Sequence, residues 1–342
     1  MKDSSPEQMM QNLLHIVSAD ADITQMIWNP ISTYWTGISE EKILAFLEHL
    51  KEWKVTNAPI FQGFKVEGFL SNSPSVVLEE FDNMPFPPHP YSALPKRFCL
   101  VLALYSFFNG RLFWVLSISR NEARTTELNA YWHLYQIFRI YTTAINYQGD
   151  AETDFYHPCE TLRVDFTPML YLAGHCCPKP SWLRWIIYEL GNVSKGGLCN
   201  SSAFATNLDI LSSLEKSAKL YSGLILIERF PPPPERIITI LLPELSGRHF
   251  VAFYATPRSG ARKRNNQQYD VLCTASWSSS GNNPRPLVET DEAPHRLFSR
   301  EWLMEQPQVK GWGSWSHIPG FDLDQALHNH ISGSTLALEA DS

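Results

Sequence analysis

A histidine with three nearby carboxylates is the group in this chain that could do acid–base chemistry. Asp154 and Glu160 flank His157, and Asp165 follows, so these side chains could exchange protons with a substrate. Loop carboxylates are common and solvated, and we interpret these residues in that way. The chain also lacks the short motifs of hydrolases, of dinucleotide- and phosphate-binding proteins and of zinc peptidases. We therefore predict no catalytic residue and no enzyme activity.

The cysteines are the second candidate group, as ligands of a metal ion. Cys159 lies close to His157, and the pair Cys176 and Cys177 follows His175, so a mixed histidine–cysteine site could be drawn. Adjacent cysteines rarely bind one metal ion together, and buried thiols pack as small apolar groups. The six cysteines show no disulfide framework, which is typical of a reducing compartment. We predict no metal site and no cofactor.

The elements that must position these residues are mainly helices. Ser5 and Pro6 mark a helix start, and Ser39 caps a second helix whose apolar residues follow helical spacing from Ile43 to Trp53. Further helices are expected near residues 92–118, 122–146, 166–175, 180–190 and 202–221. Residues 71–95 contain six prolines and are predicted to form a connecting loop. Apolar content of 44% supports a large core.

Residues 98–118 form the most apolar stretch of the chain. The stretch is long enough to cross a bilayer, but Asn109 and Arg111 lie at its centre, where a charge is costly. We predict a buried central helix, with a membrane span as the alternative.

Four prolines at residues 231–234 mark a change of structure. Two segments rich in β-branched and aromatic residues follow them, so a hairpin is expected. The predicted fold class is mainly α, a multi-helix regulatory domain with a small C-terminal β-hairpin and an irregular tail. The predicted parts are residues 1–230, 231–256 and 257–342, of which the last is a polar loop and irregular tail.

Residues 163–199 combine a helix pattern around a proline, a Cys-Cys-Pro-x-Pro break, a second apolar helix and a Gly-Gly stop. This order resembles the end of the helical regulatory region of fungal Zn2Cys6 (binuclear zinc cluster) transcription factors. The matching positions are Phe166, Pro168, Leu170, Tyr171, Cys176, Pro178, Arg184, Gly197 and Leu198. Cys177 stands where that family has Arg, and Cys199 where it has Trp. The order of signals over residues 39–256 also fits the family.

The zinc cluster that contacts DNA in that family has no counterpart here. Such a cluster needs six cysteines within about thirty residues, whereas those of this chain are scattered from Cys99 to Cys273. The resemblance implies a non-catalytic transcriptional regulator or co-regulator, of the kind that controls fungal secondary-metabolite pathways. A stand-alone co-regulator and a piece of a longer factor both fit.

The expected partner is a protein, such as a DNA-bound transcription factor. A net charge of −7 disfavours direct nucleic acid binding, which depends on Lys and Arg. A possible localisation signal, which a solvated loop would also explain, consists of Arg258, Arg262, Lys263 and Arg264. The nucleus is therefore the expected location, with the cytoplasm as alternative, and the oligomeric state is left open. The alternative function is a helical enzyme or small-molecule-binding protein of a fungal biosynthetic pathway, with an aromatic-lined cavity near residues 98–146.

Overall fold

Most of the helical part of the chain is described by the computed structural model. The described residues are 5–28, 39–62, 64, 66, 87–119, 124–146, 159–177, 180–193, 201–217, 238–243, 249–257, 269–278, 287–290 and 297–298. The chain divides into two units, Met1–Ile27 with Ile38–Ser194, and Trp28–Gly37 with Lys195–Ser342. The described part is mainly helical, as the sequence predicts.

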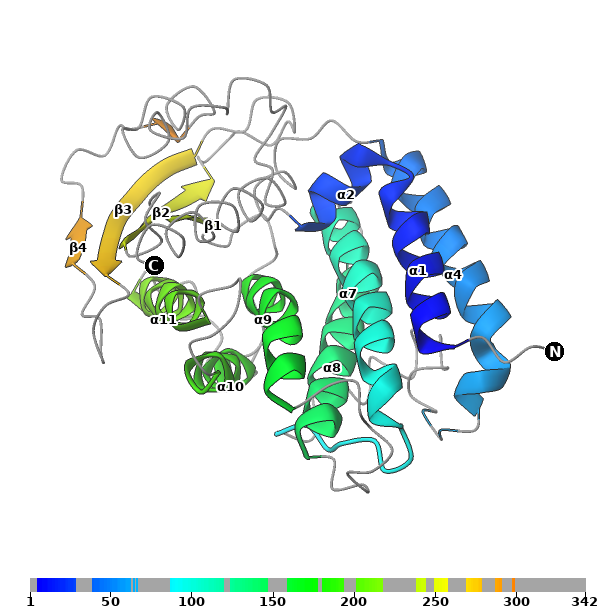
Figure 1. The fold of residues 1–342 in the computed structure, drawn as a ribbon. Helices are drawn as coiled ribbons and strands as arrows, with labels where there is room; N and C mark the ends of the chain where they lie inside the picture. Colours follow the sequence, from blue (N-terminus) through cyan, green and yellow to red (C-terminus); the bar gives the residue numbers. More distant parts are fainter. Residues whose placement is uncertain are drawn as a thin grey trace, which may run out of the picture. The chain divides into compact units, whose positions relative to one another are not determined.

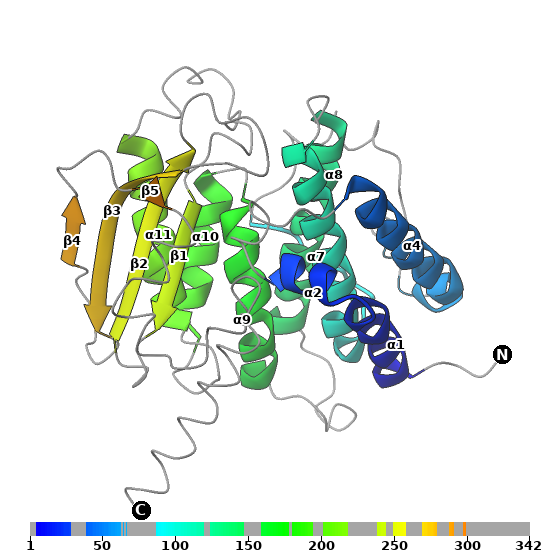
Figure 2. The same ribbon diagram turned by 90° about the horizontal axis from the view of Figure 1, so that it is seen from above.

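The first unit is a bundle of helices around a central pair. Its helices are α1 (Pro6–Ser18), α2 (Ala21–Trp28), α4 (Glu40–Gln62), α7 (Lys96–Ser119), α8 (Arg124–Asn146), α9 (Cys159–His175) and α10 (Pro180–Gly191). Helices α7 and α8 lie side by side, with α1 and α4 against α7 and with α9 against α8 (Figures 1 and 2). Helix α10 packs on α9. The bounds of α7, α8 and α10 agree with the predicted helices to within four residues, whereas α9 begins at Cys159 and not near residue 166.

Two of the helices begin at the serines that the sequence identifies as caps. The Ser5 Oγ accepts the backbone N–H of Gln8 at 3.3 Å, and the Ser39 Oγ accepts the N–H of Lys42 at 3.2 Å. Each bond satisfies an amide that the helix itself leaves without a partner. The predicted inward stripe of α4 is buried: Ile43, Phe46, Leu47, Leu50 and Trp53. Apolar side chains at helical spacing are buried here because they share one face of the helix.

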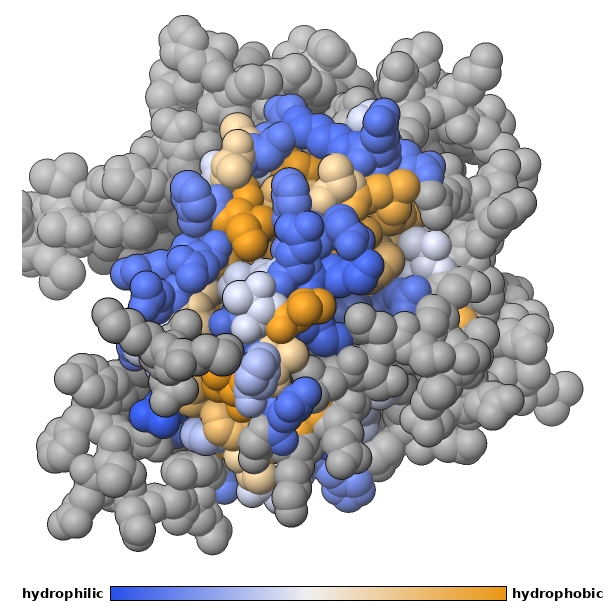
Figure 3. Space-filling view, turned by 90° about the vertical axis from the view of Figure 1, so that its right-hand side faces the viewer, coloured by the Kyte–Doolittle hydropathy of each residue, from blue (hydrophilic) through white to orange (hydrophobic). Residues whose placement is uncertain are grey.

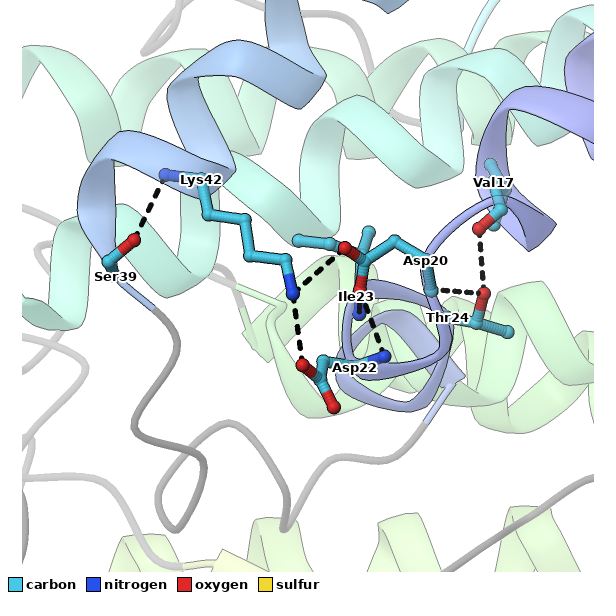
Figure 4. Close-up of polar contacts among 7 residues, drawn as sticks. All are labelled: Val17, Asp20, Asp22, Ile23, Thr24, Ser39 and Lys42. Atoms are coloured by element: carbon cyan, nitrogen blue, oxygen red, sulfur yellow. Dashed lines mark hydrogen bonds and ion pairs between the residues drawn. The ribbon is translucent and has the colours of Figure 1, made fainter.

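A polar network joins the turn between α1 and α2 to the start of α4 (Figure 4). The Lys42 ammonium lies 2.8 Å from Asp20 Oδ2 and 2.9 Å from Asp22 Oδ2. The other Asp20 oxygen accepts the N–H groups of Asp22 and Ile23, so this carboxylate caps α2. Burial acts to raise the pKa of Asp20, but the bonds from Lys42 and the two amides outweigh it, and the pKa lies below its usual value. The network thus sets the direction of α2 relative to α4.

Helices α7 and α8 approach closely at Gly110. A Cβ there would lie 3.3 Å from a Leu134 methyl group and 3.4 Å from the His133 Cβ, so only glycine leaves the neighbouring side chains in place. Helix α8 buries a stripe of apolar and aromatic residues: Leu128, Tyr131, Leu134, Tyr135, Phe138 and Tyr141. Ile145, at its end, is half-buried.

Helix α7 is the central helix of this bundle. By length and composition, Lys96–Ser117 could cross a membrane, and 89% of its most apolar window is buried inside the fold. Arg111 on this helix is 1% exposed. Its guanidinium donates to the carbonyl oxygens of Ile27 at 3.0 Å and Met26 at 3.3 Å, and to the Cys176 Sγ at 3.0 Å. The last carbonyl groups of a helix have no hydrogen-bond partner within that helix. The buried Arg111 therefore supplies donors and a positive charge to the C-terminus of α2.

The second unit contains one described helix and a sheet. The elements are α11 (Ser201–Ser217), β1 (Ile238–Pro243), β2 (His249–Pro257), β3 (Tyr269–Ser278), β4 (Leu287–Thr290) and β5 (Leu297–Phe298). The strands follow the order β1-β2-β3-β4, all neighbours being antiparallel, and β5 pairs with β3 (Figure 2). Helix α11 contacts β2.

The strands of the second unit lie in two of the parts that the sequence predicts. Strands β1 and β2 are antiparallel, with Ile240 opposite Phe253, and the hairpin at residues 231–256 stays a prediction. Strands β3 to β5 lie within residues 257–342, where the sequence predicts a polar loop and irregular tail. The two units separate near residue 194, and the predicted boundaries at residues 230 and 256 stay predictions.

Candidate functional site

The motif residues on α9 contribute to the core. Phe166 is fully buried, with its ring 5.5 Å from that of Tyr141, and Leu170 is buried beside it. Tyr171 is 6% exposed and places its ring edge on His175 at 4.7 Å. Pro168 lies inside α9. Four of the matched residues therefore occupy one packed helix.

The other predicted site residues have different surroundings. Cys176 is buried and accepts the hydrogen bond from Arg111, whereas Arg184 on α10 is exposed to solvent. Outside the described residues lie Pro178, Gly197, Leu198, Arg258, Arg262, Lys263, Arg264, Asp154 and His157. The side chains of Cys159, Glu160, Arg163 and Asp165 are also not described. Within the described ranges, no group of three or more His, Cys, Asp or Glu side chains could hold a metal ion.

A groove of about 460 Å³ lies where α8, α10 and the proline segment, defined as residues 87–90, meet. It is lined by Pro87, Pro88, His89, Pro90, Thr142, Ile145, Asn146, Trp185 and Glu189. The volume falls within the range of about 300–1,000 Å³ that is typical of ligand sites. The lining combines proline and indole rings with one carboxylate, one imidazole and one amide. It is the candidate functional site of the helical unit.

The proline segment forms one wall and is held to α8 through Tyr91, which follows it. The backbone N–H of Tyr91 donates to the Thr143 Oγ1 at 2.8 Å, and its hydroxyl donates to Gln136. The Arg139 guanidinium lies 3.9 Å from the centre of the Tyr91 ring and donates to the carbonyl oxygen of His89 at 3.0 Å. Burial raises the pKa of Tyr91 to about 12, so its hydroxyl stays protonated. The described end of the predicted connecting loop, residues 87–95, is therefore fixed against α8.

Helix α10 forms the opposite wall with Trp185 and Glu189, which share one face at (i, i+4) spacing. Aromatic rings of α8 position the indole of Trp185, 5.6 Å from Phe138 and 5.8 Å from Tyr141. The Tyr141 hydroxyl donates to the Glu189 Oε2 at 3.0 Å. The same tyrosine thus orients both functional side chains of this wall.

Sequence reasoning identified parts of this groove but did not combine them. It predicted that the prolines belong to a connecting loop and that a helix lies near residues 180–190. Among the described side chains Glu189 on that helix accepts from Tyr141, and Arg184 is exposed. Trp185 and His89 were missed. No local signal could have found them, because the two walls are far apart along the chain.

A second group of polar side chains consists of Lys54 on α4, which is buried, and His133 on α8, which is half-buried. Lys54 is 5% exposed, and burial lowers the pKa of its ammonium to about 8. The His133 ring stacks 5.7 Å from Phe113, and its buried Nδ1 has no hydrogen-bond partner. Burial, together with the charge of Lys54, lowers the pKa of His133 to about 3. Groups with such displaced pKa values are frequent at functional sites and also occur in structural networks.

No family model, curated protein or solved structure matches this chain.

Proposed function

We propose that the chain is a non-catalytic regulator or co-regulator of transcription that docks on a protein partner through its helical unit. The partner would be a DNA-bound transcription factor, and the chain would bind neither DNA nor a membrane by itself. It would act in the nucleus, and its target would be a fungal secondary-metabolite pathway. The C-terminal hairpin would be an appendage of the regulatory fold, as in the resembled family.

The groove between the proline segment and α10 is the observation that supports docking best. Both walls are held in place by hydrogen bonds and ring contacts before any ligand binds, which lowers the entropic cost of association. The polar atoms that hold the walls, such as Thr143 Oγ1, are engaged inside the protein. The lining of the groove combines proline and indole rings with the carboxylate of Glu189, the imidazole of His89 and the amide of Asn146, which suits recognition of a partner.

The face that bears α1 and α4 supports docking less well. Exposed apolar residues there are Leu14 at 41%, Leu44 at 41% and Val55 at 66%. Hydrophilic side chains interrupt the apolar areas on this face (Figure 3). Single exposed apolar residues are normal on protein surfaces, so this face carries no argument for a partner.

The test of this proposal uses the full chain in two assays. In a gel-shift assay with promoter DNA, the purified chain alone should leave the DNA unshifted. Fused to an unrelated DNA-binding domain in a fungal host, it should change the output of a reporter gene. Tight sequence-dependent DNA binding by the chain alone would contradict the proposal. So would a nuclear fusion protein that leaves the reporter unchanged.

Lys54 and His133 favour the alternative, a helical enzyme or small-molecule-binding protein. An amine with a pKa of about 8 is partly neutral near physiological pH and can attack a carbonyl carbon. Incubation with a small aldehyde and borohydride, followed by mass spectrometry, would show whether Lys54 is modified faster than Lys51, which is exposed on the same helix. Preferential modification of Lys54 favours the alternative. Modification of Lys51 alone argues for a structural Lys54.

A further inference from the structure

The chemistry of the groove specifies what kind of side chain it accepts, an inference that rests on the proposed docking function. The Glu189 carboxylate is the one acidic group of the described lining, and the indole of Trp185 lies one helical turn away. No Lys or Arg belongs to that lining. Arg139, the cation next to it, is engaged with the ring of Tyr91 and the carbonyl of His89. The groove thus offers negative charge and an aromatic ring side by side.

A guanidinium fits this pair better than other groups do. Its planar face stacks on an indole, and its N–H groups match the geometry of a carboxylate. Tyr141 donates one hydrogen bond to the Glu189 Oε2 and thereby holds the carboxylate in one orientation. The proline rings of the opposite wall offer an apolar surface for the methylene groups of an arginine side chain.

The surface next to the groove extends beyond a single side chain. Tyr188, which is 66% exposed, lies between Trp185 and Glu189 on α10 and is three residues from Trp185. Residues at this spacing share one side of a helix, so an aromatic surface continues from the groove toward solvent. Tyrosine and tryptophan are enriched at the energetic centres of protein interfaces. This continuity favours a peptide segment over a free small cation.

We propose that the groove formed by residues 87–90, Trp185 and Glu189 binds an arginine side chain presented by an extended segment of a partner protein. The guanidinium lies between the indole of Trp185 and the Glu189 carboxylate, and the neighbouring backbone of the partner passes over Tyr188.

The test measures binding of a fluorescein-labelled peptide with one arginine among alanine and glycine residues to the full chain. A matched peptide carries citrulline in place of arginine, which keeps the shape and removes the charge. The informative variant is Glu189→Gln, because the amide oxygen can still accept from Tyr141 and the fold is preserved. Glu48→Gln is the control, since it removes the same charge from an exposed site on α4.

The arginine peptide should bind the wild-type chain, and Glu189→Gln should weaken binding about ten-fold, as expected for loss of a charge-assisted hydrogen bond. The citrulline peptide should bind the wild-type chain about as weakly as the arginine peptide binds Glu189→Gln. The control Glu48→Gln should bind the arginine peptide as tightly as the wild-type chain does. Equal binding to the wild-type chain and to Glu189→Gln would overturn the inference, and so would absence of binding. If N-acetyl-arginine amide binds as tightly as the peptide, the groove is a small-cation site and the partner assignment is wrong.

The outcome is separable from that of the reporter assay. If the peptide fails to bind while the tethered chain still regulates the reporter, the arginine inference is wrong and the docking function stands. If the peptide binds while the reporter is unaffected, the groove has its ligand and the transcriptional function is wrong.

Discussion

Replacing Lys54 by methionine should stabilise the helical unit in a way that depends on pH. Lys54 on α4 is 5% exposed, and burial lowers the pKa of its ammonium from 10.5 to about 8. Because the folded-state pKa is depressed, the fold disfavours the charged amine. This difference corresponds to about 3 kcal/mol, an order-of-magnitude figure. Methionine keeps a similar volume and removes the charge.

The sign follows from which state binds the proton. Below about pH 8 both states are protonated, and the folded state bears the full cost of burying the charge. Between about pH 8 and 10.5 the folded state loses its proton first, so the wild-type chain becomes more stable relative to the variant. The extra free energy of unfolding of Lys54→Met should therefore be greatest near neutral pH and should shrink by about 3 kcal/mol as the pH rises to 10.5.

The assay is urea denaturation followed by circular dichroism at a series of pH values, with the free energy of unfolding compared between the two proteins. The series starts at pH 7.5, because the charge of Lys54 also lowers the pKa of His133 and the two proteins would differ in that titration at lower pH. Lys51→Met, on the same helix but 57% exposed at its side chain, is the control for loss of a surface lysine. If the Lys54→Met difference does not change with pH, the ammonium is not desolvated in the fold and the argument fails.

Three further outcomes are expected. The wild-type chain should lose stability on acidification because His133 is protonated in the unfolded state, and His133→Phe should not show this loss. The new phenyl ring can stay stacked on Phe113. The pKa of His133 is about 3 in the folded state and 6.5 in the unfolded state, so the unfolded state binds the proton first as the pH falls. The free energy of unfolding of the wild-type chain should therefore fall by about 1.4 kcal/mol per pH unit between pH 6.5 and pH 3. Urea titrations in which both proteins show the same dependence on pH would refute this. Arg111→Met removes donors to two carbonyl groups at the end of α2 and should cost about 2–4 kcal/mol, with faster hydrogen exchange in α2; unchanged exchange would show that the contacts do not hold that helix. Ser39→Ala should cost about 1 kcal/mol in denaturant because one amide at the start of α4 loses its acceptor, whereas a loss as small as that of an exposed surface substitution would argue against the cap.

The helices of this protein were accessible from the sequence because their signals are local. A serine cap and the spacing from Ile43 to Trp53 lie within one element, and each depends on neighbours a few residues away. The central position of α7 could also be inferred, since a long apolar helix with an arginine at its centre is better buried in a bundle than in lipid. The role of Arg111 could not, because its acceptors at Met26 and Ile27 are far away in the chain.

At the candidate site, too, local features could be predicted from the sequence and contacts between distant segments could not. The sequence by itself determined that residues 87–90 cannot be helical and that Trp185 and Glu189 lie on one side of a helix. Only the tertiary structure decided that they line one groove: Tyr91 holds the proline segment to α8, and Tyr141 of α8 holds Glu189 of α10. Backbone geometry follows from neighbouring residues, whereas a groove depends on which distant side chains pack together, and many arrangements satisfy the same apolar pattern.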